Sequence, residues 1–455
     1  MSTVRLVLRG DEPLAIEIDP AAQPLLVVQQ QPDAQTVYSL TAPSVRAILT
    51  GEPLELLGLE MEGAGVDPSA AQVRIRRLTV PSLAGWIPPL QLEAGLSRQQ
   101  SDIAVSGTLS ALDGRISGRI DGTADIAADT GRVEVSVRPI RFQPRTLQPV
   151  DIAPALAAET DLAQVTGQLG GTVTLRWQDG PPSTVFRVTA RDLGFIVAGV
   201  RVQGLAGSVS LDRLVPIRTP PGQRLTVALI DPGMPATNGA VRFRFDAAGR
   251  LRVDHAEIEI SGGRLSLHNV VIDPRSPRHD IVIFADGLDL AEVLERADVP
   301  GASARGRISG TIPVSLSADG VIIADASLTT DAPGLLRYRP AAPTPALPSD
   351  DPRIRLLKGA LEDFRYDTLS VSLDGRTGAA WQSRLRISGR NPDFLEGQPF
   401  ILNVNIEVVP GASVLELGDA RFAVGDALPI YNALFGVRFL EWLGNTITAL
   451  RPAAR

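Results

Sequence analysis

Apolar and polar residues alternate with a period of two along most of the chain. The clearest runs are 133–137, 173–177, 241–245, 369–373 and 400–408. Such alternation is typical of a β-strand with one apolar and one polar face. Short turns rich in Gly and Asp separate the runs, and connections of hairpin length join antiparallel strands. We therefore predict a mainly β, largely antiparallel fold, although alternation alone fits a curved open sheet, a sandwich or a barrel.

Five segments carry a helical pattern instead: 42–50, 151–164, 288–297, 353–366 and 427–450. Segment 288–297 follows a capping aspartate, whereas 353–366 is compatible with a helix or a strand. Segment 427–450 is the best candidate for an amphipathic helix, because its large apolar residues share one stripe. That stripe consists of Leu428, Tyr431, Phe435, Phe439, Trp442 and Leu443.

Two further features interrupt the alternation. The string GRISG occurs at 114–118 and again at 306–310. Glycines inside strands often mark bulges or tight bends, but the recurrence also fits one β-meander unit used many times. The Pro-rich stretch 340–352 cannot join a sheet ladder, so we expect a loop or an insert there.

The composition excludes several classes of protein. The chain has 455 residues, of which 44% are hydrophobic, 21% charged and only 4% aromatic, and its net charge at pH 7 is −7. These values do not fit general disorder. The absence of cysteine removes disulfides, Cys-based metal sites and thiol catalysis. No block of clustered Lys and Arg indicates a nucleic-acid partner.

No motif for catalysis or cofactor binding is present. The chain has neither a G-x-S-x-G elbow nor a phosphate-binding glycine loop. Its three histidines, His255, His268 and His279, lack the spacing of metal ligands, and we interpret them as structural or surface residues. We predict no catalytic residue, no metal and no cofactor, and therefore not an enzyme. Scattered carboxylates leave open a cryptic hydrolase on a β scaffold.

Between about residues 250 and 410 the chain resembles the C-terminal domain of YdbH-like proteins, which belong to the AsmA-like group that includes TamB. Six ordered segments carry this resemblance. They are GGRLSLHNVVID at 262–273, GRISGTIPVSLSADGVIIADASL at 306–328, PGLLRYRP at 333–340, ALEDFRYDTLSVSLDG at 360–375, ISGRNPDF at 387–394 and ILNVNI at 401–406. The older dicarboxylate-transport label of this domain finds no support in these residues.

The resemblance implies an elongated, curved β-sheet that forms an open hydrophobic groove. It also implies non-enzymatic transport of phospholipids through the periplasm, between the inner and outer membranes of a Gram-negative envelope. A small outer-membrane lipoprotein at the C-terminal end is the implied partner. A structural or assembly role for outer-membrane proteins, as for TamB-type proteins, is the alternative. Because family members are longer and carry an N-terminal membrane helix, we expect this chain to be a fragment or its anchor to be a separate polypeptide.

On this basis we divide the chain into a repetitive β-groove segment (1–249), the YdbH-like domain (250–410) and final strands with an amphipathic helix (411–455). The helix at 427–450 is expected either to plug the end of the groove or to contact a partner or a membrane through Phe435, Phe439 and Trp442. Twelve apolar strand residues are predicted to line the groove. They are Val133, Val135, Val173, Leu175, Val241, Phe243, Phe245, Leu369, Val371, Leu402, Val404 and Ile406.

Overall fold

The computed structural model describes most of the chain. The described residues are 4–8, 14–18, 26–30, 36–49, 52–64, 70–178, 182–214, 216–317, 320–339, 351–409, 413–417, 420–424 and 426–449. Within them the fold is mainly β, as predicted, with 27 strands in one antiparallel sheet, a separate two-stranded sheet and six short α-helices. The chain divides into two compact units, one formed by Met1–Phe195 with Ala206–Gln223 and the other by Ile196–Leu205 with Arg224–Arg455.

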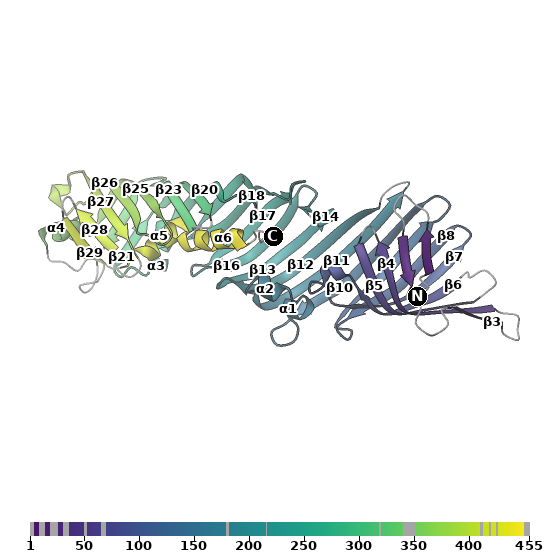
Figure 1. The fold of residues 1–455 in the computed structure, drawn as a ribbon. Coiled ribbons are helices and arrows are strands. Elements are labelled where there is room, and N and C mark those ends of the chain that lie inside the picture. The colour runs from purple at the N-terminus through teal and green to yellow at the C-terminus, as the bar shows by residue number, and fades with distance from the viewer. Residues whose placement is uncertain are drawn as a thin grey trace. The chain divides into compact units, whose positions relative to one another are not determined.

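The strands of the first unit pair almost entirely in chain order, each antiparallel to the next (Figure 1). The exception is at the start, where β4 pairs with both β2 and β3. The strands lying wholly in this unit's first segment are β1 (Val4–Leu8), β2 (Leu14–Ile18), β3 (Leu26–Gln30), β4 (Thr36–Leu49), β5 (Glu52–Ala64), β6 (Ala70–Thr79), β7 (Leu90–Gln99), β8 (Asp102–Ala111), β9 (Ile116–Asp125), β10 (Thr130–Phe142) and β11 (Ala163–Gln178).

Several strands lie around the division between the units. They are β12 (Ser183–Val197), β13 (Val200–Leu211), the short pair β14 (Arg213–Leu214) and β15 (Ile217–Arg218), and β16 (Gln223–Asp231).

The second unit continues the same antiparallel pattern. Its strands are β17 (Ala236–Phe245), β18 (Leu251–Ile260), β19 (Gly263–Ile272), β20 (Arg278–Asp289), β21 (Ala302–Arg305), β22 (Arg307–Ser317), β23 (Gly320–Thr330), β24 (Gly334–Tyr338), β25 (Phe364–Arg376), β26 (Trp381–Arg390), β27 (Phe400–Val408), β28 (Ser413–Leu417) and β29 (Ala420–Val424). Strand β20 pairs with β22 rather than β21, and β23 pairs with β25, while β21 and β24 pair with each other.

The helices are short, and they show that two of the sequence predictions need correction. They are α1 (Pro149–Ile152), α2 (Leu156–Glu159), α3 (Leu290–Arg296), α4 (Pro352–Leu361), α5 (Leu428–Phe435) and α6 (Val437–Ala449), with 3₁₀ turns at Pro81–Leu83 and Leu395–Gly397. The predicted helix at 42–50 is wrong, because its described residues 42–49 belong to β4 and pair along β5. A short Ala/Ile/Leu run fits a strand as well as a helix, and cross-strand pairing decides between them.

The predicted single helix at 427–450 is also corrected, since it is two helices. Gly436 ends α5 with φ of 63°, a left-handed conformation that glycine adopts at little cost. Of the other helical segments, 151–164 contains α2 and the end of α1, and 288–297 contains α3, whose first turn Asp289 caps by accepting a hydrogen bond from the Ala291 N–H. Segment 353–366 is a helix followed by a strand, α4 and then β25. Residues 340–350 of the predicted Pro-rich loop lie outside the described residues.

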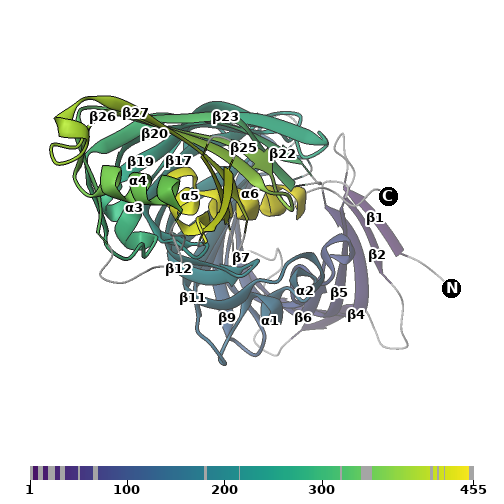
Figure 2. The same cartoon turned by 90° about the vertical axis from the view of Figure 1, so that its left-hand side faces the viewer.

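The main core lies in the second unit, where α5 and α6 lie along the strands β20 to β25 (Figure 2). The family resemblance implied apolar residues that line an open groove, but here they fill a packed interior. The chain's own helices supply the second layer that a one-sided apolar sheet requires.

Candidate functional site

In the first unit, cross-strand pairing aligns apolar residues into rows that run across eight strands. One such row is Leu40, Met61, Val73, Ala94, Gly107, Ile120, Val135 and Val173, taken in order from β4 to β11. Neighbouring strands lie about 4.8 Å apart, so seven intervals make the row about 34 Å long. This length exceeds the roughly 15 Å that the acyl chains of one leaflet occupy in a bilayer core of about 30 Å.

A second row lies beside the first on the same face. It consists of Gly63, Ala71, Leu96, Val105, Gly122, Val133 and Leu175. Neither row contains a charged or polar side chain, and none of its residues is exposed, most being half-buried. We call this surface, defined by the two rows, the apolar face of the first unit.

No α-helix among the described residues of the first unit packs extensively on this face. Its two helices, α1 and α2, follow β10 and associate instead with a turn. The N–H of Ala155 donates to the carbonyl oxygen of Gly85, in the turn between β6 and β7. As far as the structure describes the chain, the apolar face therefore has no helical layer like the one that covers the strands of the second unit.

Glycines keep the apolar face smooth where strands approach closely. A Cβ at Gly107 would lie 2.4 Å from the carbonyl oxygen of Glu93 and 2.7 Å from the Cβ of Ala94. A Cβ at Gly131 would lie 2.1 Å from the ring of Trp177, which shows that the indole lies over that glycine. These two positions therefore require glycine, because a side chain there would collide with the neighbouring strand.

The opposite face of the same strands is ionic. Arg74 lies between Glu60 and Glu93 on neighbouring strands, with nitrogen–oxygen distances of 3.9 Å and 3.0 Å. Arg76 also pairs with Glu60, and this hydrogen-bonded ion pair lowers the pKa of the Glu60 carboxyl. Exposed pairs of this kind add little stability. Their effect is to make this face of the sheet hydrophilic, in contrast to the apolar face.

A hollow of about 910 Å³ lies beside strands β7 to β11, but it belongs mainly to the polar face. Its lining includes Gln99, Asp102, Thr130, Arg132 and Arg176, which alternate with the apolar residues of these strands. We therefore base the candidate site on the apolar rows rather than on this polar depression.

The second unit has similar apolar rows, but helices cover them. One row, formed by Leu328, Val371, Leu385 and Val404, crosses β23, β25, β26 and β27. Leu328 is 0% exposed and Val371 5%. Helix α4 packs on Val404 at one end of the row.

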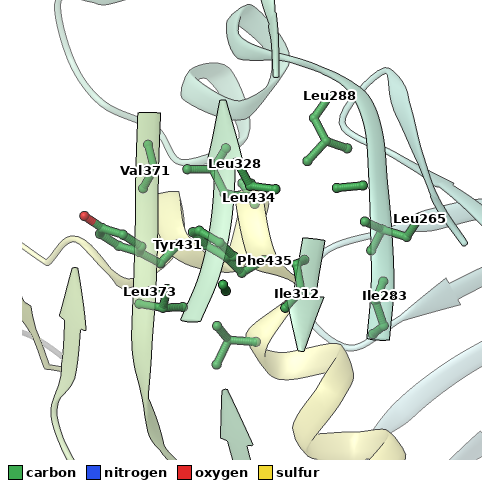
Figure 3. Packing of buried hydrophobic residues seen from close by; sticks show 14 of the residues in the cluster. Leu265, Ile283, Leu288, Ile312, Leu328, Val371, Leu373, Tyr431, Leu434 and Phe435 are labelled. Atoms are coloured by element: carbon green, nitrogen blue, oxygen red, sulfur yellow. The ribbon is translucent and has the colours of Figure 1, made fainter. Parts of the chain in front are cut away.

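Figure 3 shows how α5 meets this sheet: Tyr431, Leu434 and Phe435 lie beside Leu328, Val371 and other strand residues of the same cluster. Helix α6 packs on β22 and β23, and α3 packs on α5. Full burial of a large apolar side chain contributes about 1.5–3 kcal/mol. These contacts therefore make the helix pair a substantial part of the core.

The structure separates the twelve predicted groove residues into two groups. Val133 pairs with Leu175 and Val135 with Val173, and all four lie on the apolar face of the first unit. The other eight lie in the second unit. There Phe243, Leu369, Val371 and Val404 are buried, while Val241, Phe245, Leu402 and Ile406 are half-buried.

The three residues predicted to contact a partner or a membrane lie on the two C-terminal helices. Phe435 is 0% exposed and stacks at 6.3 Å from Tyr431, so in this fold it offers no surface to a partner. Phe439 and Trp442 are half-buried, with ring centroids 5.7 Å apart. Sequence periodicity identified the stripe, but it did not indicate which surface the stripe covers.

Two of the three histidines meet across β18 and β19. His255 and His268 pair in register, with their Nδ1 atoms 3.0 Å apart and their rings stacked. Thirteen positions separate them in the chain, so spacing alone did not predict the pair. His279 is buried. In the part of the chain that the structure describes, no group of three or more His, Asp or Glu residues is arranged to hold a metal ion.

Among the described residues, no helix has both the length and the apolar character required to cross a bilayer. No curated protein matches the chain significantly, and no solved structure does. One family does match: the model described as YdbH-like, intermembrane phospholipid transport protein YdbH, covers residues 19–408. Since this match spans most of the 455 residues, the chain belongs to the YdbH-like family of intermembrane phospholipid transport proteins.

Proposed function

We propose that the protein carries phospholipids between the inner and outer membranes, with their acyl chains against the apolar face of the first unit. The observation that carries this proposal is the pair of aligned rows across β4 to β11, which no helix of the described residues covers extensively. Their alignment runs across the strands, so a lipid moving from strand to strand meets the same apolar surface at each step.

The energetics favour acyl chains as the occupant. Burial contributes about 0.8 kcal/mol per methylene, so roughly fifteen methylenes would contribute about 12 kcal/mol if fully covered and about half of that on an open face. A smooth row of Val, Ile, Leu, Ala and Gly provides this burial without specific anchors. The apolar face therefore offsets much of the cost of exposing acyl chains to water between the membranes. Because successive positions are similar, no single position binds the lipid much more tightly than the next.

No catalytic group is needed for such transport, and we infer a non-enzymatic role. We place the protein in the periplasm of a Gram-negative envelope, with a small outer-membrane lipoprotein as its partner at the C-terminal end. These assignments rest on the family and on the resemblance described above. The energy source and a preferred direction would come from other components.

A pair of adjacent substitutions tests the proposal. Val135→Glu places a carboxylate in the apolar row, between Ile120 and Val173, whereas Ser136→Glu places the same group on the opposite face. There it lies across from Arg119, with which Ser136 pairs in register. A charged group on the apolar face must be desolvated when an acyl chain covers it, which is costly.

We expect Val135→Glu to lose copurifying phospholipid and lipid transfer between donor and acceptor vesicles, while Ser136→Glu retains both. Circular dichroism and thermal unfolding of both variants establish that each is folded. Equal lipid loading of two folded variants would contradict the proposal.

A further inference from the structure

The second unit buries its apolar rows beneath the chain's own C-terminal helices. Leu328, Val371 and Leu373 belong to adjacent strands, and the side chains of Leu434 and Phe435 lie against this cluster (Figure 3). The helix pair thus occupies the kind of surface that, in the first unit, we assign to acyl chains. An acyl chain and the apolar stripe of a helix can both cover such a face, because each buries apolar area without specific hydrogen bonds.

Few polar contacts fasten the helix pair to the sheet. The Ser261 hydroxyl donates to the carbonyl oxygen of Ala433 at 3.3 Å, and Tyr431 forms a side-chain hydrogen bond with Ser383. At the start of α5, the Ala427 N–H donates to the Ser413 hydroxyl at 3.1 Å. The large buried side chains of the pair, among them Leu434, Phe435 and Leu440, meet the strands through apolar packing, which a lipid can replace.

The helix pair also carries a feature that opposes tight docking. Glu441 on α6 is half-buried, and this burial raises the pKa of its carboxyl, although Arg438 partly offsets the effect. A carboxylate that loses water on docking makes the covered state less favourable at neutral pH.

We propose that α5 and α6 form a displaceable cover over a second acyl-chain binding face, formed by β20, β22, β23 and β25. This inference rests on the proposed function. With the cover docked, the second unit binds no lipid. When lipid arrives, acyl chains take the place of Leu434, Phe435 and Leu440 on the strands, and the apolar stripe of the helices becomes free to contact a lipid surface.

A disulfide that locks the cover provides the test. A Cβ at Gly444 would lie 3.1 Å from Cγ2 of Val321 on β23. Because Cγ2 is one bond from the Cβ of Val321, the two Cβ atoms come close to the separation of about 3.5–4.5 Å that a disulfide requires, and Val321→Cys with Gly444→Cys is suited to form one. The chain has no cysteine of its own, so this pair would contain its only thiols.

The full-length double variant is incubated, oxidised or reduced, with vesicles of phosphatidylethanolamine whose acyl chains carry a diazirine. After illumination, mass spectrometry locates the labelled peptides. The two redox states of one protein serve as each other's control, so an effect of the substitutions on folding does not enter the comparison.

We expect β25 around Val371 and Leu373 to be labelled in the reduced protein and to lose its label on oxidation, while Val135 in the first unit is labelled in both states. Labelling of β25 that is absent in both states, or equal in both, would overturn the cover proposal if Val135 is still labelled. Absence of label at Val135 as well would instead overturn the proposed function.

Discussion

The hydroxyl of Ser261 donates a hydrogen bond to the carbonyl oxygen of Ala433, 3.3 Å away and 172 positions later in the chain. Ser261 lies in the turn between β18 and β19 and is 1% exposed, while Ala433 lies within α5. The contact therefore connects the C-terminal helix pair to the strands at a point that water does not reach. It is one of the polar links between the cover and the sheet, beside those of Ala427 with Ser413 and of Tyr431 with Ser383.

We predict that Ser261→Ala weakens the docking of α5 by about 0.5–1.5 kcal/mol, the usual net contribution of such a hydrogen bond. Hydrogen exchange should show faster exchange in α5 and α6, with little change in β4 to β11. Ser97→Ala, at an exposed position on the polar face of the first unit, provides the control. Unchanged protection of both helices would show that the packing alone holds them.

Glu441 gives the docking of the helices a dependence on pH. Burial raises the pKa of its carboxyl above the ordinary value of 4.5, so the docked state favours the protonated form. This contribution is fully present below pH 4.5 and is lost as the pH rises through the raised pKa. We predict that Glu441→Gln stabilises the docked helices at pH 7, which thermal unfolding and hydrogen exchange can measure.

The gain from Glu441→Gln should disappear below pH 4.5, where the native carboxyl is protonated as well. Glu295→Gln, at an exposed position on α3, is a matched control that removes a carboxylate elsewhere. A gain that is the same at both pH values would mean that the charge of Glu441 does not oppose docking.

Asp246 stabilises the hairpin of β17 and β18. Burial acts to raise the pKa of its carboxyl, but hydrogen bonds from Arg250, Arg252 and the Ala248 N–H outweigh it and lower the pKa to about 2 from 3.8. The resulting stability is present above pH 3.8 and is lost as the pH falls toward 2.

We predict that Asp246→Asn lowers the free energy of unfolding by about 1–2 kcal/mol at pH 7, after allowance for screening by solvent. The difference from the native chain should shrink in acid, as urea unfolding at several pH values would record. Asp113→Asn, in an exposed turn, should change little. If Asp246→Asn also changed little at pH 7, the hydrogen-bonded network around this carboxylate would be without energetic effect.

Gly436 allows the chain to turn between α5 and α6. Its φ of 63° costs a residue with a side chain about 1–2 kcal/mol. We predict that Gly436→Ala destabilises the helix pair by that amount, seen as earlier thermal unfolding and faster exchange in α6. Gly170→Ala is the control, because a Cβ there meets only Pro139, at ordinary contact distances of 3.8 Å or more. Equal effects of the two changes would contradict this assignment.

The sequence predicted the strands well because alternation is a local signal. Val133, Val135, Val173 and Leu175 could be placed on strands from their neighbours alone, and the register then brings them together in pairs. The segment 42–50 was misassigned because a short aliphatic run does not distinguish a helix from a strand. Its pairing with β5 makes it a strand, and the residues of the segment alone do not indicate which strand it pairs with.

What covers an apolar face is a matter of long-range contact, which periodicity does not contain. The stripe through Phe435 was recognisable, but its docking on Leu328 and Val371 joins segments far apart in the chain. For the same reason the contact between His255 and His268 could not be predicted from the sequence, since it depends on the register of β18 and β19. The two chemically similar apolar faces, of which the described helices cover only the one in the second unit, therefore could not be told apart from the sequence.

The central claim is that acyl chains lie on one face of β4 to β11, and the positions of lipid attachment test it most directly. The full-length native chain is illuminated with vesicles of phosphatidylethanolamine that carries a diazirine on its acyl chain, and each labelled residue is identified by mass spectrometry. The account predicts label on Ile120, Val135 and Val173. It predicts none on Ser136 and Thr172, which are next to Val135 and Val173 in the chain but lie on the opposite face. Label distributed equally over both faces, or confined to the polar face, would contradict it.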